Sequence, residues 1–165
     1  MSVEPGYYRK KIIDLVIPYA KDDERIHLLV CDMGFGVTDN FKKELPNRIF
    51  NMGIMEQGTV GIAAGMSMTG LIPIVYSIVN FLAFRAIEQI RNNVIKQGLN
   101  VKFIATGVND YFRFLGDSHC CGEDDKEIMK LINMKVYDPY EPSSDNFEKM
   151  VNKWITETVP AYIRV

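Results

Sequence analysis

Histidine and cysteine are scarce in this sequence. Its 165 residues include two histidines, His27 and His119, and three cysteines, Cys31, Cys120 and Cys121. Two histidines are too few for a metal centre built from several imidazoles. The cysteines are odd in number, lack C-x-x-C spacing and include a vicinal pair, which argues against a relaxed disulfide or a zinc site. We therefore expect three reduced thiols and no metal bound by this chain's own residues.

Long apolar runs and an excess of positive charge are also missing. No segment approaches the roughly 18 apolar residues of a membrane span, and the N-terminus lacks the basic-then-apolar order of a secretory signal. The formal net charge is -2, which gives no basic footprint for nucleic acid or for an anionic membrane. These absences predict a cytoplasmic protein that binds neither nucleic acid nor membrane.

The composition that remains is that of one ordinary folded domain. Hydrophobic residues make up 47% and charged residues 24% of the chain, without a tract that suggests disorder. The length predicts a single domain over residues 1–165. Short apolar segments alternate with segments of helical spacing. The expected strands are 25–32, 48–53, 71–78, 101–107, 134–138 and 160–165, and the expected helices are 7–21, 41–45, 56–69, 81–98, 123–133 and 146–158.

This alternation predicts the fold class and the place of the site. Strands that are apolar throughout, separated by helices, indicate a three-layer α/β/α sandwich around a mostly parallel sheet of about six strands. Asn80 is expected to cap the helix 81–98, and Pro18 to bend or end the first helix. In such folds ligands bind beyond the carboxyl ends of the strands. The segments to search are therefore 32–36, 53–57, 77–84, 107–119 and 138–142.

Glu56 is the one charge in the stretch "NMGIMEQGTVGIAAG". Its position at a strand-to-helix junction is compatible with an ordinary helix-start carboxylate. The helix that follows contains Gly58, Gly61 and Gly65, and each glycine costs roughly 1 kcal/mol of helix propensity. The usual gain is the close approach of another backbone or a ligand. We therefore expect this helix to pack against a neighbour such as a second subunit.

Four segments together carry a resemblance to a known family. The stretch "RIFNMGIMEQGTVGIAAGMSMTGLIPIVYSIVNFLAFRAIEQIRN" resembles the pyrimidine-binding domain of the transketolase family of thiamine diphosphate enzymes. The segments "CDMGFG", "GDSHCCGED" and "PAYIRV" resemble further motifs of that domain, in the same order. The resemblance extends from about Ile26 onward. It implies the thiamine diphosphate-binding fold of the pyrimidine type and thiamine diphosphate as the cofactor.

The resemblance assigns cofactor contacts to five residues around the third and fourth helices. The glutamate that matches Glu56 hydrogen-bonds N1′ of the aminopyrimidine and so helps its exocyclic nitrogen to remove the C2 proton of the thiazolium. Such proton sharing needs a desolvated carboxyl. Phe81 matches the phenylalanine that stacks on the pyrimidine. Ile78 stands where many members carry an aromatic residue, Phe84 where Tyr or Arg is found, and Met55 precedes the glutamate.

Three polar residues are implied in catalysis and substrate binding. Asp32 matches a loop acid near the thiazolium and the entrance. His119 matches a histidine that contacts sugar hydroxyls, and a loop histidine also suits proton transfer near neutral pH. Asp117 belongs to the same motif. The residues alone leave other interpretations open: a loop cap for Asp32, a surface histidine for His119 and a core ring for Phe81.

Several positions depart from the family pattern. Cys120 and Cys121 replace polar residues, and Leu115 stands where many transketolases carry an aspartate that contacts the donor. Asp138 stands where an arginine often binds the sugar phosphate, and an acid there would repel a phosphate. These departures predict a substrate other than a standard pentose phosphate, such as another sugar or a nucleotide-linked sugar.

Two parts of a complete transketolase are missing from the sequence. The chain has no GDG motif followed by an asparagine, the pattern that holds Mg²⁺ and the diphosphate, and it stops at Val165 where the third domain would begin. We expect the small subunit of a split enzyme that transfers a two-carbon ketol unit between sugars. A larger partner would supply the diphosphate site and Mg²⁺ in an α2β2 assembly. The alternatives are a β subunit of a 2-oxoacid dehydrogenase and a non-catalytic scaffold.

Overall fold

The computed structural model of the chain describes residue 4, residues 6–142 and residues 146–165. Across these residues the chain forms one sheet of six parallel strands in the order β2-β1-β3-β4-β6-β5. The predicted parallel sheet is confirmed. The strands are β1 (Ile26–Val30), β2 (Ile49–Asn51), β3 (Ile72–Ile78), β4 (Lys102–Thr106), β5 (Lys135–Tyr137) and β6 (Ala161–Arg164).

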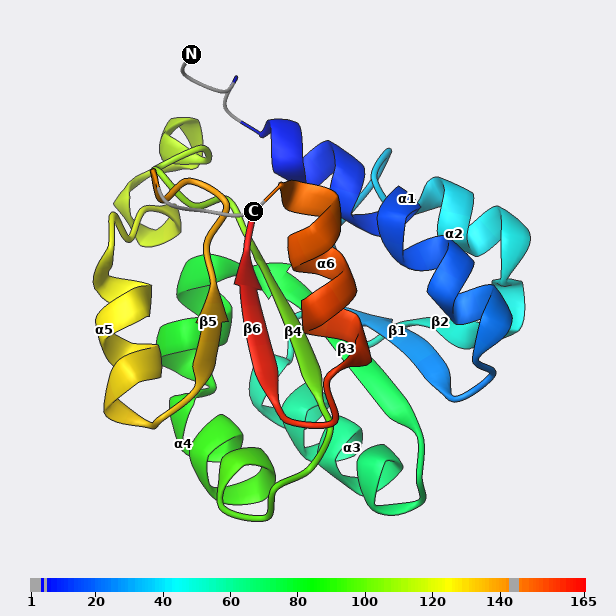
Figure 1. Ribbon diagram of the computed structural model, residues 1–165. Coiled ribbons are helices and arrows are strands. Elements are labelled where there is room, and N and C mark those ends of the chain that lie inside the picture. Colours follow the sequence, from blue (N-terminus) through cyan, green and yellow to red (C-terminus); the bar gives the residue numbers. More distant parts are fainter. Residues whose placement is uncertain (1–3, 5, 143–145) are drawn as a thin grey trace.

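Helices cover both faces of the sheet, which makes three layers (Figure 1). On one face lie α1 (Tyr7–Asp22), α2 (Asp39–Glu44) and α6 (Phe147–Thr156), and on the other lie α3 (Glu56–Met68), α4 (Ile87–Gln89) and α5 (Asp124–Leu131). In the described ranges, no helix combines the length and the apolar character that a bilayer crossing requires.

Each face of the sheet has its own hydrophobic core. Alternate residues of β3 contribute to both cores, since Ile74 and Tyr76 pack toward α1 and α6 while Val75 packs toward α3 and α5. This pattern is expected for a strand that is buried on both sides. The helix α3 ends at Met68, and Gly70 then adopts the left-handed conformation (φ 92°) that stops it.

The segment after β3 differs from the single regular helix expected over 81–98. It forms a π-helical turn at Phe81–Arg85, the short α4, and a second π-helical stretch at Ile90–Ile95. Wider turns of this kind occur often at functional sites because they redirect side chains. Pro18 does not end α1, which continues through it to Asp22, and the alternative that it bends the helix stays a prediction.

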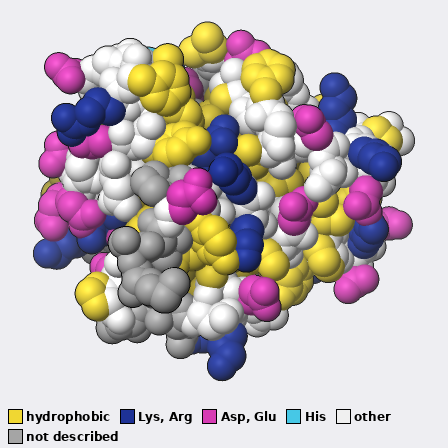
Figure 2. Space-filling model, turned by 90° about the horizontal axis from the view of Figure 1, so that it is seen from above, with side chains coloured by type: hydrophobic (Ala, Val, Ile, Leu, Met, Phe, Trp, Pro, Cys, Tyr) yellow, Lys and Arg dark blue, Asp and Glu magenta, His cyan; other side chains and the backbone are white. Residues whose placement is uncertain are grey.

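The carboxyl ends of the strands form the upper edge in Figure 1, and Figure 2 looks down on that edge. The strand order reverses beside β1, which has β2 on one side and β3 on the other. The loops that leave β1 and β3 therefore run to opposite faces of the sheet. The place where such loops separate is called a topological switch point, and ligands of open α/β sheets bind there. Figure 2 shows hydrophobic side chains at this surface, between basic and acidic ones.

Candidate functional site

Glu56 is the first residue of α3, and its side chain is only 1% exposed. The hydroxyl of Ser77, on the neighbouring strand β3, donates a hydrogen bond to Oε1 at 3.0 Å. The guanidinium of Arg85 donates to Oε2 through Nη1 at 2.6 Å. The start of the helix adds backbone N–H dipoles that favour a negative charge. Glu56 is therefore a buried, ion-paired carboxylate, which an ordinary helix-start acid at the surface would not be.

The ring of Phe81 meets the same guanidinium. Cζ of Arg85 lies 4.2 Å from the centroid of the Phe81 ring, within the range of a cation–π contact. Both residues belong to the first π-helical turn. The carboxylate of Glu56 and the face of Phe81 thus both contact the flat guanidinium of Arg85.

His119 lies against the edge of Phe81. The two ring centroids are 4.9 Å apart and the rings cross at 72°, while Nδ1 of His119 is 3.0 Å from Oγ of Ser118. Nδ2 of Asn80 donates to the backbone carbonyls of Ser118 at 3.0 Å and of Cys120 at 2.8 Å. The side chain of Asn80 therefore fixes the loop on both sides of His119. It makes no cap hydrogen bond at the helix start, so the capping prediction is wrong.

A cavity of about 390 Å³ opens beside Phe81 and Arg85. Phe84, which is half exposed, and Asn80 also line it. Oδ1 of Asn80 is buried and has no hydrogen-bond partner among the described residues. Glu56 does not line this cavity but is joined to it through Arg85. The aromatic wall, the unsatisfied acceptor and the adjacent carboxylate match a flat heterocycle that carries ring nitrogens and an amino group. The planar guanidinium of Arg85 already lies between Glu56 and Phe81. An aminopyrimidine is also planar and carries N–H groups, so these residues fit it.

Asp32 is exposed in the loop after β1, with its backbone in the left-handed region (φ 49°). Its side chain and the amide of Asn51 are joined reciprocally: Asn51 Nδ2 donates to Oδ1 of Asp32 at 3.0 Å, and the Asp32 N–H donates to Oδ1 of Asn51 at 3.1 Å. Oδ1 of Asn51 also accepts from the N–H of Gly53 at 3.0 Å. Asp32 thus connects the loops after β1 and β2, and its cofactor and substrate contacts stay predictions.

Three other predicted site residues lie at the same end of the sheet. Met55 immediately precedes α3 and is half exposed. Ile78 ends β3 and packs against the core on the α3 side. Asp117 is exposed and begins the 3-10 turn Asp117–His119. Their contacts with cofactor or sugar stay predictions.

The three cysteines are free thiols in different surroundings. Sγ of Cys31 is 3.6 Å from Oγ1 of Thr59, and burial raises the pKa of Cys31 to about 11. Burial, and then the charge of Asp125, raise the pKa of Cys121 to about 12. Cys120 is half-buried and lines the cavity beside Phe81.

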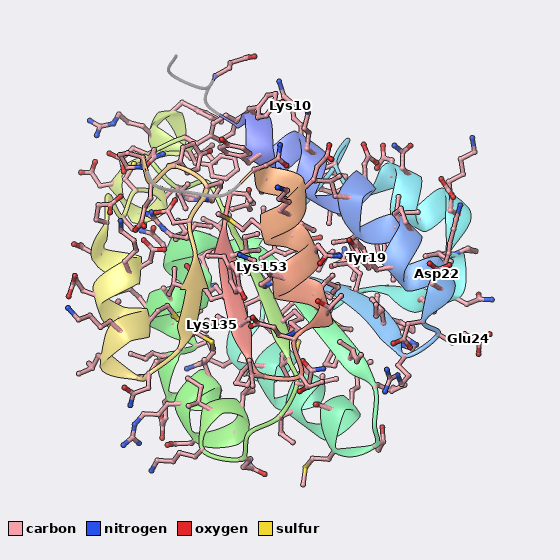
Figure 3. The ribbon with its side chains drawn as sticks, in the orientation of Figure 1. Lys10, Tyr19, Asp22, Glu24, Lys135 and Lys153 are labelled. Carbon is pink, nitrogen blue, oxygen red and sulfur yellow. The ribbon has the colours of Figure 1, made fainter. Side chains whose placement is uncertain are left out.

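Another cavity, of about 290 Å³, lies at the opposite, amino end of the sheet. Tyr19 and Asp22, both labelled on α1 in Figure 3, belong to its wall. The residues predicted for cofactor and substrate binding lie at the other end, so this cavity is separate from the candidate site.

Comparison with known proteins decides the family. The family model described as "Transketolase, pyrimidine binding domain" matches residues 7–165. The chain belongs to the transketolase pyrimidine-binding domain family. Membership implies thiamine diphosphate as the cofactor, and this domain is the part of a transketolase that binds its pyrimidine.

Named relatives include subunits of split transketolases. A 6-deoxy-6-sulfo-D-fructose transketolase subunit from Clostridium sp. (strain MSTE9) is 28% identical over 166 residues, which cover 100% of this chain and 51% of that protein. A putative transketolase C-terminal section from Methanocaldococcus jannaschii is 36% identical over 160 residues, which cover 95% of this chain and 49% of that protein. The chain spans about half the length of these curated relatives.

Solved structures agree with this family. A protein described as a split gene transketolase, inactive β4 tetramer, superimposes with a TM-score of 0.79 at 34% identity, covering 94% of this chain and 50% of that chain. Transketolase from Campylobacter jejuni superimposes with a TM-score of 0.71 at 15% identity, covering 94% of this chain and 25% of that chain. The second likeness shows the fold alone.

One departure from the transketolase pattern has a structural explanation. Asp138 is buried and accepts a hydrogen bond from Nη1 of Arg164 at 2.5 Å. Arg164 also binds Asp125 through Nε at 2.8 Å, and both side chains are fully buried. The expected repulsion of a phosphate assumed an unpaired acid. Because Asp138 is buried and paired with Arg164 and Lys126, it is not the free acid on which the expected repulsion of a phosphate depended.

Sequence reasoning missed the roles of four residues at the candidate site: Asn51, Ser77, Asn80 and Arg85. The available signal for Arg85 was its position four residues after Phe81, because residues at that spacing on a helix share a face. Asn51 and Ser77 lie next to strand ends, where polar side chains reach the switch point.

Proposed function

We propose that this chain is the pyrimidine-binding subunit of a split, transketolase-type enzyme that transfers a two-carbon ketol unit between sugars. The observation that carries the proposal is the position of the buried Glu56 carboxylate and the Phe81 ring, which both contact the planar guanidinium of Arg85. The named relatives support this function over the two alternatives, because they include subunits of split transketolases.

Thiamine diphosphate, when bound, supplies a carbon nucleophile that adds to a ketose carbonyl and an electron sink for the C–C bond that breaks. Glu56 would share a proton with the aminopyrimidine ring nitrogen, because a desolvated carboxyl is matched to such a weak base. Phe81 would provide the flat face for the ring. Since Nδ1 of His119 faces Ser118, Nε2 is the nitrogen assigned to the substrate hydroxyls.

A larger partner would hold Mg²⁺ and the diphosphate, and α3 is the helix proposed to meet it. In the described structure nothing lies within 4 Å of a Cβ placed on Gly61 or Gly65. Ile62 and Met68, on the same helix, are large hydrophobic side chains that remain exposed. Bare glycines permit close approach of a second backbone, and exposed apolar side chains supply the area that association buries. Glu56 begins this helix, so the partner would also close the site.

Reconstitution tests the proposed function. The chain would be mixed with the product of a neighbouring coding sequence that carries the GDG and asparagine motif, together with thiamine diphosphate and Mg²⁺. Ketol transfer from a ketose to an aldehyde would be measured with phosphorylated, sulfonated, free and nucleotide-linked sugars. We expect an α2β2 complex that is active, while each chain alone is inactive.

Matched acidic variants make the result specific. Glu56→Ala in the reconstituted complex should lower kcat by at least about 10²-fold, the lower range for a positioned proton-transfer group. Glu88, an exposed acid of α4, serves as the control, and Glu88→Ala should leave kcat unchanged. Full ketol transfer by the Glu56→Ala complex would remove the catalytic role.

A further inference from the structure

The guanidinium of Arg85 occupies both contacts that the proposed function gives to the aminopyrimidine. Nη1 is 2.6 Å from Oε2 of Glu56, and Cζ is 4.2 Å from the centroid of the Phe81 ring. A guanidinium and the amidine edge of an aminopyrimidine are both flat, delocalised N–C–N groups. Arg85 and the pyrimidine cannot make these contacts at the same time.

We propose that Arg85 is a placeholder, a side chain that holds the empty pyrimidine site and leaves when the pyrimidine enters. The proposal rests on the proposed function, because it takes Glu56 and Phe81 as the pyrimidine contacts. It adds that Oε2 of Glu56 exchanges Arg85 for the pyrimidine, and that a proton is taken up in this exchange.

The proton follows from the hydrogen-bonding capacity of the groups involved. A carboxylate paired with a guanidinium can only accept hydrogen bonds, and N1′ of a neutral aminopyrimidine is also an acceptor. Two acceptors cannot bind each other, so one proton must enter the Glu56–N1′ pair when Arg85 leaves. The proton comes from solvent, and it stays between the carboxyl oxygen and the ring nitrogen.

The other groups that face Glu56 do not supply that proton. Ser77, from β3, donates its hydroxyl hydrogen to Oε1 and leaves Oε2 to the exchange. Cys31, after β1, lies close enough that the charge of Glu56 acts on its thiol, but burial raises the pKa of Cys31 to about 11. A thiol so weakly acidic is a poor proton source near neutral pH.

The position of Arg85 allows the movement that the proposal requires. Its side chain is 39% exposed, whereas that of Glu56 is 1% exposed. Arg85 also lines the open 390 Å³ cavity together with Phe84 and Ser118. Its guanidinium can therefore turn into water and regain hydration, while the buried carboxylate stays in place.

Calorimetric titration of the full chain with thiamine tests this exchange. Titrations in two buffers of different ionisation enthalpy give the number of protons taken up on binding. Wild type should take up about one proton per thiamine, since binding converts an ion-paired carboxylate into a proton-sharing pair. Arg85→Met removes the guanidinium that pairs with the buried carboxylate and that thiamine must displace. This variant should bind thiamine about tenfold more tightly and take up fewer protons than wild type, because an unpaired buried charge is unfavourable.

Two further arginine variants separate charge from shape. Arg91 is exposed and hydrogen-bonds the side chain of the adjacent Asn92, so Arg91→Met should bind thiamine as wild type does. Arg85→Lys keeps the positive charge and should keep the proton uptake. It also preserves the test if Arg85→Met folds poorly by circular dichroism.

The results that oppose the placeholder differ from those that oppose the proposed function. Weaker thiamine binding by Arg85→Met, or equal proton uptake by Arg85→Met and wild type, would overturn the placeholder and leave the pyrimidine site intact. Undiminished thiamine binding by Glu56→Ala would overturn the pyrimidine site and the placeholder together.

Discussion

Replacing Arg164 with methionine should strongly destabilise the fold. Arg164 is fully buried, and its guanidinium binds Oδ2 of Asp125 through Nε at 2.8 Å and Oδ2 of Asp138 through Nη1 at 2.5 Å. Burial alone would lower the pKa of Arg164, but hydrogen bonds and attraction from Asp125 and Asp138 outweigh it and raise that pKa. The arginine therefore stays charged, and methionine would leave both carboxylates without it.

The loss in the free energy of unfolding depends on the contacts that the carboxylates of Asp125 and Asp138 keep. Removing one partner of a buried ion pair costs about 3–5 kcal/mol. Asp125 keeps the hydroxyl of Tyr162 at 3.0 Å, and Asp138 keeps the ammonium of Lys126 at 3.5 Å. These remaining contacts place the expected loss for Arg164→Met near the middle of that range, about 4 kcal/mol. The free energy of unfolding of a whole domain is about 5–15 kcal/mol, so the variant would be marginally stable.

Urea unfolding followed by circular dichroism measures this loss. The triple variant Arg164→Met, Asp125→Asn, Asp138→Asn buries no charge at these positions and should regain about half of the loss. Arg25→Met, which removes an exposed ion pair with Asp23, is the control and should change the midpoint far less. A small effect of Arg164→Met, or a triple variant less stable than the single one, would refute this reasoning.

Two further predictions concern the loop beside the site and the thiols. Asn80→Ala removes the hydrogen bonds that hold the loop on both sides of His119, so hydrogen exchange of that loop should rise severalfold in mass spectrometry. Unchanged exchange would argue against the role of Asn80. Iodoacetamide at about pH 8 should modify Cys120 first. The pKa values of Cys31 and Cys121 are raised to about 11 and about 12, which leaves at most about one thiolate in a thousand. Faster labelling of Cys31 than of Cys120 in the peptide map would contradict this order.

The fold was predictable from the sequence because its signals are strong and local. Short, mostly apolar segments such as 71–78 favour strands buried on both faces, and glycines such as Gly70 mark the helix ends. Parallel strands place their carboxyl ends together, so the neighbourhood of Glu56 and Phe81 was also predictable.

The partners of the site residues were not predictable in the same way. The contact between Arg85 and Glu56 depends on a π-helical turn, and periodicity does not distinguish such a turn from a regular helix. Asn80 precedes a helix as a capping residue would, yet the carbonyls around His119 compete for its amide. The ion pair of Asp138 with Arg164 joins residues 26 positions apart, a separation at which side-chain pairing leaves no local signal.

The rate of hydrogen–deuterium exchange at C2 of the thiazolium, measured by NMR in the reconstituted complex, tests the role of Glu56 most directly. If Glu56 activates the cofactor through the aminopyrimidine, Glu56→Ala should slow this exchange by about 10²–10⁴-fold. Equal exchange rates in the wild-type and Glu56→Ala complexes, with cofactor bound in both, would contradict the account.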